Sequence, residues 1–227
     1  MCIIDLPAPS LSYTKPLPLE TILALRRSIR SFEDKPITIK QLSQLLWAAY
    51  GVSDPRRGFL TCPSAGATFP LTIYVVVGEN SVVYDDGTPL PAGSYRYDNH
   101  SHRLEMVKEG DLRSKLAEAC LGQEWVRTAP ISIIIAAIFE RTTMYYGKRG
   151  ERYVLFEAGH AGQNIYLEVT ALGLGTVAIG AFYDDEVAKT VGLKHNEKPL
   201  YVYPVGVPKT IYTVDENSIR SYIESHR

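Results

Sequence analysis

Three arginines and two serines lie within six residues near the start of the chain, in the stretch LALRRSIRSF at residues 23–32. The cations are Arg26, Arg27 and Arg30, and Ser28 lies among them. The dipole of a helix favours one cation at its C-terminal end, but three neighbouring cations repel one another. An anion relieves that repulsion, and arginine binds a phosphate through paired hydrogen bonds. The cluster therefore predicts a local phosphate site, with a plain helix end as the alternative.

The loop TCPSAGATFP at residues 61–70 is a second candidate. Its small residues, Ser64, Ala65 and Gly66, leave room for backbone N–H groups to approach a planar ligand closely. Considered alone, the loop is better explained as a plain connection between two elements.

Overall charge and cysteine usage exclude several classes of partner. The 227 residues contain 24 Lys and Arg against 25 Asp and Glu, a formal net charge of −1, so nucleic-acid binding is not expected. The longest uncharged apolar stretch, residues 129–139, is too short to cross a bilayer and predicts a buried strand. Cys2, Cys62 and Cys120 lack C-x-x-C spacing, and the N-terminus does not resemble a signal peptide. These features are typical of a cytoplasmic protein.

Common catalytic motifs are also missing from the sequence, including the P-loop and H-E-x-x-H. Gly173, Gly175 and Gly180 do not have dinucleotide-binding spacing, and they follow a predicted helix instead of a strand. His100 and His102 alternate in a predicted turn without a third ligand nearby. We therefore expect an exposed polar hairpin there, and no metal site.

Hydrophobic periodicity and turn residues predict an α+β domain that would position the two candidate stretches. Helices are expected over residues 19–28, 38–51, 111–121, 151–172 and 184–192. Strands are expected over residues 71–77, 93–98, 103–107, 129–139, 175–182 and 200–208, with residues 52–70 as a loop. We expect one domain over residues 1–227, with an extended N-terminal arm (1–18) and a C-terminal tail (210–227) ending in a short helix or an extended arm.

Two helices have particular signals. Thr38 and Gln41 have capping-box spacing at the start of the second helix, and Gly51 suits its end. Residues 151–172 form the longest helix, and apolar residues cover most of its circumference. Such a helix is buried, either inside the fold or between subunits.

Four motifs, in this order, resemble the FMN-dependent nitroreductase family: RRSIRSF, PSAGATFPLTIYVVV, AGHAGQNIYLEVTALGLGTVAIGAF and YPVGVPK. The resemblance spans residues 19–209. The stretches LPAPSL and GKRGERYVLFEAGHAGQN are similar to the peptide azoline dehydrogenase branch, which forms thiazoles and oxazoles. The resemblance implies a nitroreductase-like α+β fold with a central, mostly antiparallel sheet flanked by helices. It also implies an intertwined homodimer around the long central helix, with two FMN sites at the interface.

The resemblance assigns residues to the FMN cofactor. Those expected to hold its phosphate, ribityl chain and ring edge are Arg26, Arg27, Ser28, Arg30 and Lys209. Those expected to line the ring are Pro63, Ser64, Ala65 and Gly66 from the partner subunit, and Ile179, Gly180 and Ala181, with Gln163 as a polar neighbour. The expected catalytic residues are Gly180, through a backbone N–H near flavin N5, and Tyr146, which matches the tyrosine of a Lys-Tyr pair in the azoline branch.

The implied activity is ping-pong hydride transfer from NAD(P)H through flavin N5 to a nitroaromatic, a quinone or another small acceptor. Tyr145 stands where the azoline branch has its lysine. Oxidation of a peptide azoline or another heterocycle is therefore an alternative, and an FMN-binding module without turnover is a third. No metal or membrane partner is expected.

Overall fold

A seven-stranded antiparallel sheet in the order β1-β8-β7-β5-β9-β11-β10 organises the protein. The computed structural model describes residues 2–12 and 17–227. The strands are β1 (Ile3–Asp5), β5 (Leu71–Val77), β7 (Gly93–Asp98), β8 (Arg103–Glu109), β9 (Ile131–Ala137), β10 (Gly175–Thr176) and β11 (Lys198–Gly206). Two small sheets join β2 (Ile37–Thr38) with β6 (Val82–Val83), and β3 (Val52–Asp54) with β4 (Phe59–Leu60). The expected central antiparallel sheet is confirmed.

Strands β5 and β9 lie in the middle of the sheet, and every one of their residues is buried. They pair antiparallel, with Val75 opposite Ile133. Because both faces are covered, both strands are apolar apart from Thr72 and Ser132, instead of alternating with polar residues. The apolar stretch at residues 129–139 is therefore a buried central strand, as predicted.

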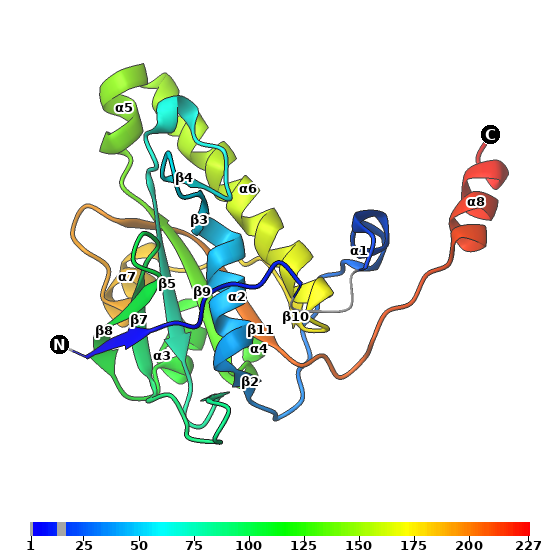
Figure 1. Cartoon of the computed structure of the whole chain (residues 1–227), viewed down its shortest axis with the longest axis horizontal. Coiled ribbons are helices and arrows are strands. Elements are labelled where there is room, and N and C mark those ends of the chain that lie inside the picture. The colour runs from blue at the N-terminus through cyan, green and yellow to red at the C-terminus, as the bar shows by residue number, and fades with distance from the viewer. Residues whose placement is uncertain (1, 13–16) are drawn as a thin grey trace.

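Helices cover both faces of the sheet (Figure 1). One face packs against α2 (Ile39–Tyr50) and α6 (Arg149–Ala171), and the other against α3 (Arg113–Ala119), α4 (Glu124–Thr128) and α7 (Asp184–Val191). The short α5 (Glu140–Tyr146) packs against α6. Among the described residues, no helix is both long and apolar enough to cross a membrane.

Helix α2 begins and ends where its sequence signals predict. The Thr38 side chain accepts a hydrogen bond from the Gln41 backbone N–H at 3.1 Å, and the Gln41 side chain accepts one from the Thr38 N–H at 2.9 Å. Gly51 follows the last helical residue as the C-cap. The capping box is thus confirmed.

The first helix, α1 (Leu19–Leu25), is three residues shorter than predicted. Arg26 is already non-helical, and the Ile29 N–H donates to the carbonyl oxygen of Thr176 at 2.8 Å. This bond and a β-bridge between Ser28 and Thr176 replace the helical bonds of the expected last turn. The serine-arginine cluster therefore lies on an extended segment and not in a helix end.

Helix α6 is buried within the chain on one side only. The residues packed into the core are Val154, Ala158, Ala161, Ile165 and Val169. On the other side, Leu155 and Phe156 are 53% and 54% exposed. The sequence predicted that this helix is buried either inside the fold or between subunits. In a single copy, the fold buries one face of α6 and leaves the face with Leu155 and Phe156 exposed.

Gly162 sets how closely α6 approaches β11. A Cβ atom at this position would overlap the Tyr203 hydroxyl and come within 3.0 Å of its Cζ. Tyr203 is 3% exposed and has little room to move. We expect Gly162→Ala to lower the free energy of unfolding by about 1–3 kcal/mol, measured by urea denaturation. Adding Tyr203→Phe should recover part of the loss; a Gly162→Ala variant as stable as wild type would contradict this packing.

The C-terminal tail combines both expected forms. An extended segment leads to α8 (Glu216–Ser225), which lies away from the rest of the molecule (Figure 1). None of its residues is buried, and Ile219, Tyr222 and Ile223 are all exposed. At the other end, residues 1 and 13–16 of the expected N-terminal arm lie outside the described residues.

His102 differs from the prediction of an exposed hairpin. Its Nδ1 lies 2.7 Å from the Tyr97 hydroxyl, and its Nε2 lies 2.8 Å from Ser43 Oγ and 2.9 Å from the Pro7 carbonyl. Burial lowers the pKa of the His102 imidazole. Through its contacts with Pro7 and Ser43, His102 joins the N-terminal segment to α2. His100 is exposed, as predicted. Within the described parts of the chain, no cluster of three metal-ligating side chains occurs.

Candidate functional site

The residues expected at the cofactor fall into two groups toward opposite ends of α6 (Figure 1). We call the first the cationic half-site: Arg26, Ser28, Arg30, Lys209, Ile179, Gly180 and Ala181. We call the second the loop half-site: Pro63, Ser64, Ala65, Gly66 and Tyr146. On α6, Tyr166 contacts Ser28 of the cationic half-site, and Glu157 contacts Cys62 next to the loop half-site. These two α6 residues are nine positions apart, about 14 Å along the helix axis.

Three segments distant in sequence meet at the cationic half-site. The extended segment 26–32 lies beside β10 through the bond from Ile29 to Thr176. The Lys209 N–H donates to the carbonyl oxygen of Ser31 at 3.1 Å. The backbone of Lys209 is thereby held next to the serine-arginine cluster, although 178 positions separate Ser31 from Lys209 (209 − 31).

Tyr166 connects these segments from α6. Its hydroxyl lies 2.9 Å from Ser28 Oγ and accepts a hydrogen bond from the Ala178 N–H at 2.8 Å. The Arg26 guanidinium lies over its ring, 5.0 Å from the centroid. The sequence prediction counted Tyr166 as part of an apolar face. The phenol group was the available signal, because a buried tyrosine hydroxyl needs a hydrogen-bond partner.

The cations of this half-site have no carboxylate partner. Among the residues that the structure describes, no Asp or Glu forms a salt bridge with Arg26, Arg30 or Lys209. Arg30 instead lies 5.8 Å from the Trp125 ring centroid. Cations gathered without a counter-charge are suited to an anionic ligand.

Gly180 and Ala181 add backbone donors to the same half-site. Both are exposed, and within the described chain neither N–H has a hydrogen-bond acceptor. Ile179, just before them, is buried and exchanges two hydrogen bonds with Val202, at 2.9 and 3.0 Å. That pairing anchors the segment, while the following two amides remain available to a ligand.

Arg27 lies apart from the other cations. One guanidinium nitrogen donates to the carbonyl oxygens of Ala24 at 3.0 Å and Arg26 at 2.7 Å. Its guanidinium carbon lies 3.8 Å from the ring centroid of Tyr212 in the C-terminal tail. Arg27 therefore binds carbonyl oxygens at the end of α1 and stacks on the C-terminal tail. For this arginine, the structure agrees with a plain helix end, the alternative to a phosphate site.

The loop half-site has an unusual backbone. Gly66, Ala67 and Phe69 have positive φ angles of 60°, 52° and 44°. Ser64 Oγ accepts a hydrogen bond from the Phe69 N–H at 2.9 Å, while the N–H groups of Ala65 and Gly66 have no acceptor within the described chain. Left-handed conformations are unfavourable for residues with a Cβ, so surrounding contacts must hold this loop.

Tyr146 lies against this loop. A Cβ atom on Gly66 would be 2.6 Å from the Tyr146 hydroxyl, and the Tyr146 ring packs edge-on against Tyr153 with centroids 5.1 Å apart. Tyr145 is 78% exposed. Gln163 is exposed on α6, between Glu157 and Tyr166 in the sequence. The structure therefore brings Tyr146 to the loop, whereas no side-chain hydrogen bond joins Gln163 to either group within the described chain.

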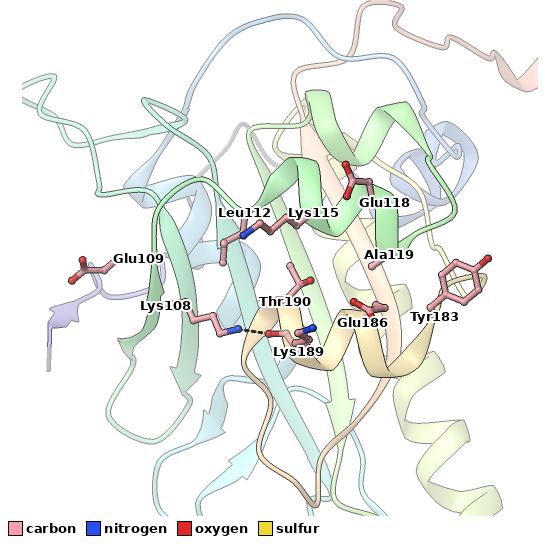
Figure 2. Close-up of a pocket in the computed structure, with 10 residues that line it drawn as sticks. All are labelled: Lys108, Glu109, Leu112, Lys115, Glu118, Ala119, Tyr183, Glu186, Lys189 and Thr190. Carbon is pink, nitrogen blue, oxygen red and sulfur yellow. Dashed lines mark hydrogen bonds between the residues drawn. The ribbon is translucent and has the colours of Figure 1, made fainter.

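A surface groove lies outside both half-sites. This groove of about 720 Å³ lies between β8, α3 and α7. Figure 2 shows the side chains that line it. Its charged lining residues are Lys108, Lys115, Lys189, Glu109, Glu118 and Glu186. Three cations and three anions give no preference for one sign of ligand, and none of the predicted site residues lines the groove. The size of the groove alone does not make it a better candidate for the functional site than the two half-sites.

We expect Tyr166→Phe to destabilise the protein by about 1–2 kcal/mol, because the variant leaves the Ala178 N–H and the Ser28 hydroxyl without their partner. Urea denaturation measures the loss. Tyr183→Phe, which removes an exposed hydroxyl, is the control and should change stability little. Equal stabilities of the two variants would show that Tyr166 does not join the segments energetically.

Comparison with known proteins identifies the class defined by this fold and site as oxidoreductases of the nitroreductase kind. The sequence matches the Nitroreductase family over residues 23–207, and the chain belongs to that family. It is 47% identical over 188 residues to MJ1384 of Methanocaldococcus jannaschii, named as a candidate nitroreductase, covering 83% of this chain and 90% of that protein. A crystal structure of a candidate nitroreductase from Ralstonia eutropha JMP134 superposes with a TM-score of 0.77 at 32% identity, covering 92% of this chain and 90% of that chain.

The azoline branch is also represented. The microcin B17-processing protein McbC of Escherichia coli is 29% identical over 166 residues, which is 72% of this chain and 60% of that protein. A chain of the Escherichia coli microcin synthetase McbBCD complex superposes with a TM-score of 0.67 at 24% identity, covering 91% of this chain and 77% of that chain. At that identity the superposition shows a common fold. The relatives thus include both branches of the sequence resemblance.

Proposed function

We propose that this protein is an FMN-dependent, cytoplasmic homodimer that transfers hydride from NAD(P)H to a nitroaromatic, a quinone or another small acceptor. The observation that carries the proposal is the cationic half-site. There, within residues 2–12 and 17–227, Arg26, Arg30 and Lys209 form no salt bridge and the Gly180 and Ala181 amides have no hydrogen-bond acceptor. Unpaired cations beside free amides are what a phosphate-bearing, electron-accepting ring needs from a protein.

Each group in the cationic half-site has a role in this proposal. When bound, FMN supplies two-electron hydride chemistry. Arg26 and Lys209 bind the phosphate, and the Ser28 hydroxyl, fixed by Tyr166, donates to the ribityl chain or the ring edge. The amides of Gly180 and Ala181 donate to the ring and stabilise negative charge there. Arg27 is left out of these contacts, because its guanidinium is bonded to the end of α1.

A second copy of the chain supplies the other half of the site. The exposed face of α6, with Leu155 and Phe156, and the exposed apolar residues of α8 are surfaces that another copy can cover. Dimerisation through α6 brings the loop half-site of one copy to the cationic half-site of the other. The free amides of Ala65 and Gly66 then face the cofactor. Free cysteines at positions 2, 62 and 120 agree with the cytoplasm.

Anaerobic spectroscopy tests the proposal. The purified protein should carry or take up FMN, and NADH or NADPH should bleach the flavin absorbance without oxygen. A panel of quinones and nitroaromatics should restore the absorbance. Protein that takes up no added FMN contradicts the proposal. Bound FMN that neither nicotinamide bleaches would favour the alternative of a flavin-binding module without turnover.

Oxidation of a peptide azoline is the second candidate function. It is favoured by the Tyr146 hydroxyl beside Gly66 and by the likeness to McbC. Azoline oxidation would pass a hydride to FMN and a proton to the Tyr146 oxygen, which would have to act as the phenolate, without the neighbouring lysine of that branch. Tyr146→Phe should abolish azoline oxidation but leave FMN binding and bleaching by NAD(P)H intact. Full azoline oxidation by this variant would remove Tyr146 from the proposed chemistry.

A further inference from the structure

Glu157 is a buried carboxylate on α6 behind the loop half-site. It is 2% exposed, and the hydroxyl of the equally buried Tyr50 on α2 donates to its Oε1 at 2.5 Å. Among the described residues, no cation forms a salt bridge with it. A buried acid held only by hydroxyl groups is costly, because burial disfavours its charged form. Burial accordingly raises the pKa of Glu157, against the opposing effect of its hydrogen bonds.

The other partners of Glu157 are in the loop. The Ser64 side chain interacts with the Glu157 carboxylate and opposes the rise in its pKa, and the Cys62 thiol donates to the Glu157 backbone carbonyl at 3.5 Å. The residues on both sides of Pro63 are therefore attached to the same residue of α6. Ser64 Oγ also accepts from the Phe69 N–H at 2.9 Å, which closes the loop around its left-handed residues. Polar contacts thus run from the Tyr50 hydroxyl through the Glu157 carboxylate and Ser64 to the Phe69 N–H.

We propose that Glu157, supported by Tyr50, is a positioning residue that holds the loop half-site in the conformation that receives the flavin. The inference rests on the proposed function, because it gives the loop a flavin to face. Glu157 does not itself touch the cofactor: it is covered by protein, and it acts through Ser64. Its contribution is to fix the free amides of Ala65 and Gly66 in a loop that its own backbone preferences do not favour.

Glu168 provides a matched control on the same helix. It lies eleven residues, about three turns, after Glu157 and on the same side of α6. Its carboxylate interacts with the Gln44 side chain of α2, and burial raises its pKa as it does that of Glu157. Glu168→Ala therefore removes a comparable carboxylate contact to α2 without touching the loop half-site.

Two measurements on the full-length protein test the inference. Hydrogen exchange of residues 63–69 in the FMN-free protein reports the loop, and fluorescence titration reports FMN affinity. Glu157→Ala should speed exchange in the loop and weaken FMN binding, each by about tenfold or more. Glu157→Gln, which keeps the shape and one acceptor oxygen, should recover most of both. Glu168→Ala should leave both within about twofold of wild type.

The outcomes separate the inference from the proposed function. If Glu157→Ala does not fold, Tyr50→Phe decides instead, because it removes one hydroxyl from the same chain of polar contacts and should shift both readouts in the same direction. Unchanged loop exchange in Glu157→Ala or Tyr50→Phe, or an equal effect of Glu168→Ala, overturns the inference. A wild-type protein that binds no FMN overturns the proposed function, while the exchange measurement still reports whether Glu157 holds the loop.

Discussion

The double variant Arg26→Ala/Lys209→Ala is expected to bind FMN at least about 100-fold more weakly than the wild type, because each charge-assisted hydrogen bond to a phosphate contributes about 1.5–3 kcal/mol. Both residues lie on segments joined by the bond from the Lys209 N–H to Ser31, and neither has a carboxylate partner within the described chain. Quenching of FMN fluorescence on titration measures the affinity.

A charge-matched control separates this local effect from a loss of net charge. Arg103→Ala/Lys115→Ala also removes two cations, from β8 and α3, and involves none of the proposed site residues. It should bind FMN like the wild type, and raising the salt concentration should weaken the wild type more than Arg26→Ala/Lys209→Ala. Equal losses in both double variants would show that Arg26 and Lys209 do not contact the phosphate.

If the proposed dimer forms through α6, Phe156→Glu is expected to convert it to monomers and to abolish FMN binding with it. Phe156 is 54% exposed on the uncovered face of α6. Burying a new, unpaired carboxylate there twice in a symmetric interface should raise the dimer dissociation constant about a thousandfold or more. Sedimentation equilibrium measures the association, and FMN content is read from the absorbance of the same samples.

Val107→Glu is the control for this variant. Val107 is also an exposed apolar residue, at 38%, but it lies on β8, toward the sheet edge opposite β10. This variant should remain a dimer with wild-type FMN content. A Phe156→Glu variant that stays dimeric would remove the α6 face from the interface. A monomeric variant that still binds FMN tightly would show that one copy holds the cofactor alone.

Much of the fold could be predicted because its signals are local. The capping box of Thr38 and Gln41 and the C-cap at Gly51 define α2 within a few residues, and the absence of charged residues from the largely apolar β5 and β9 indicates strands covered on both faces. The location of α6 was left open between core and interface. Its two faces explain why: one packs into the core, while the other leaves Leu155 and Phe156 exposed.

What the sequence did not predict depends on contacts between distant residues. Ser28 was placed in a helix, whereas its pairing with Thr176, 148 residues away (176 − 28), draws it into an extended segment. Tyr166 meets Ser28 across 138 residues, and Glu157 meets Tyr50 across 107. No local periodicity encodes such pairs. Arg27 is a different case, because its hydrogen bonds to the Ala24 and Arg26 carbonyls are local and match the plain helix-end alternative.

The central claim is that each FMN lies between the cationic half-site of one copy and the loop half-site of another. Mixing two defective chains tests it most directly. Arg26→Ala/Lys209→Ala removes the cationic contacts, and Gly66→Asp places a side chain tolerant of positive φ where the loop must admit the ring. Each variant alone should bind little FMN.

After subunit exchange, confirmed by native mass spectrometry, half of the dimers contain one chain of each kind. Each mixed dimer has one intact site out of two. The account therefore predicts that the mixture recovers about one quarter of the wild-type FMN content. Mixed dimers that form but bind no FMN would contradict it.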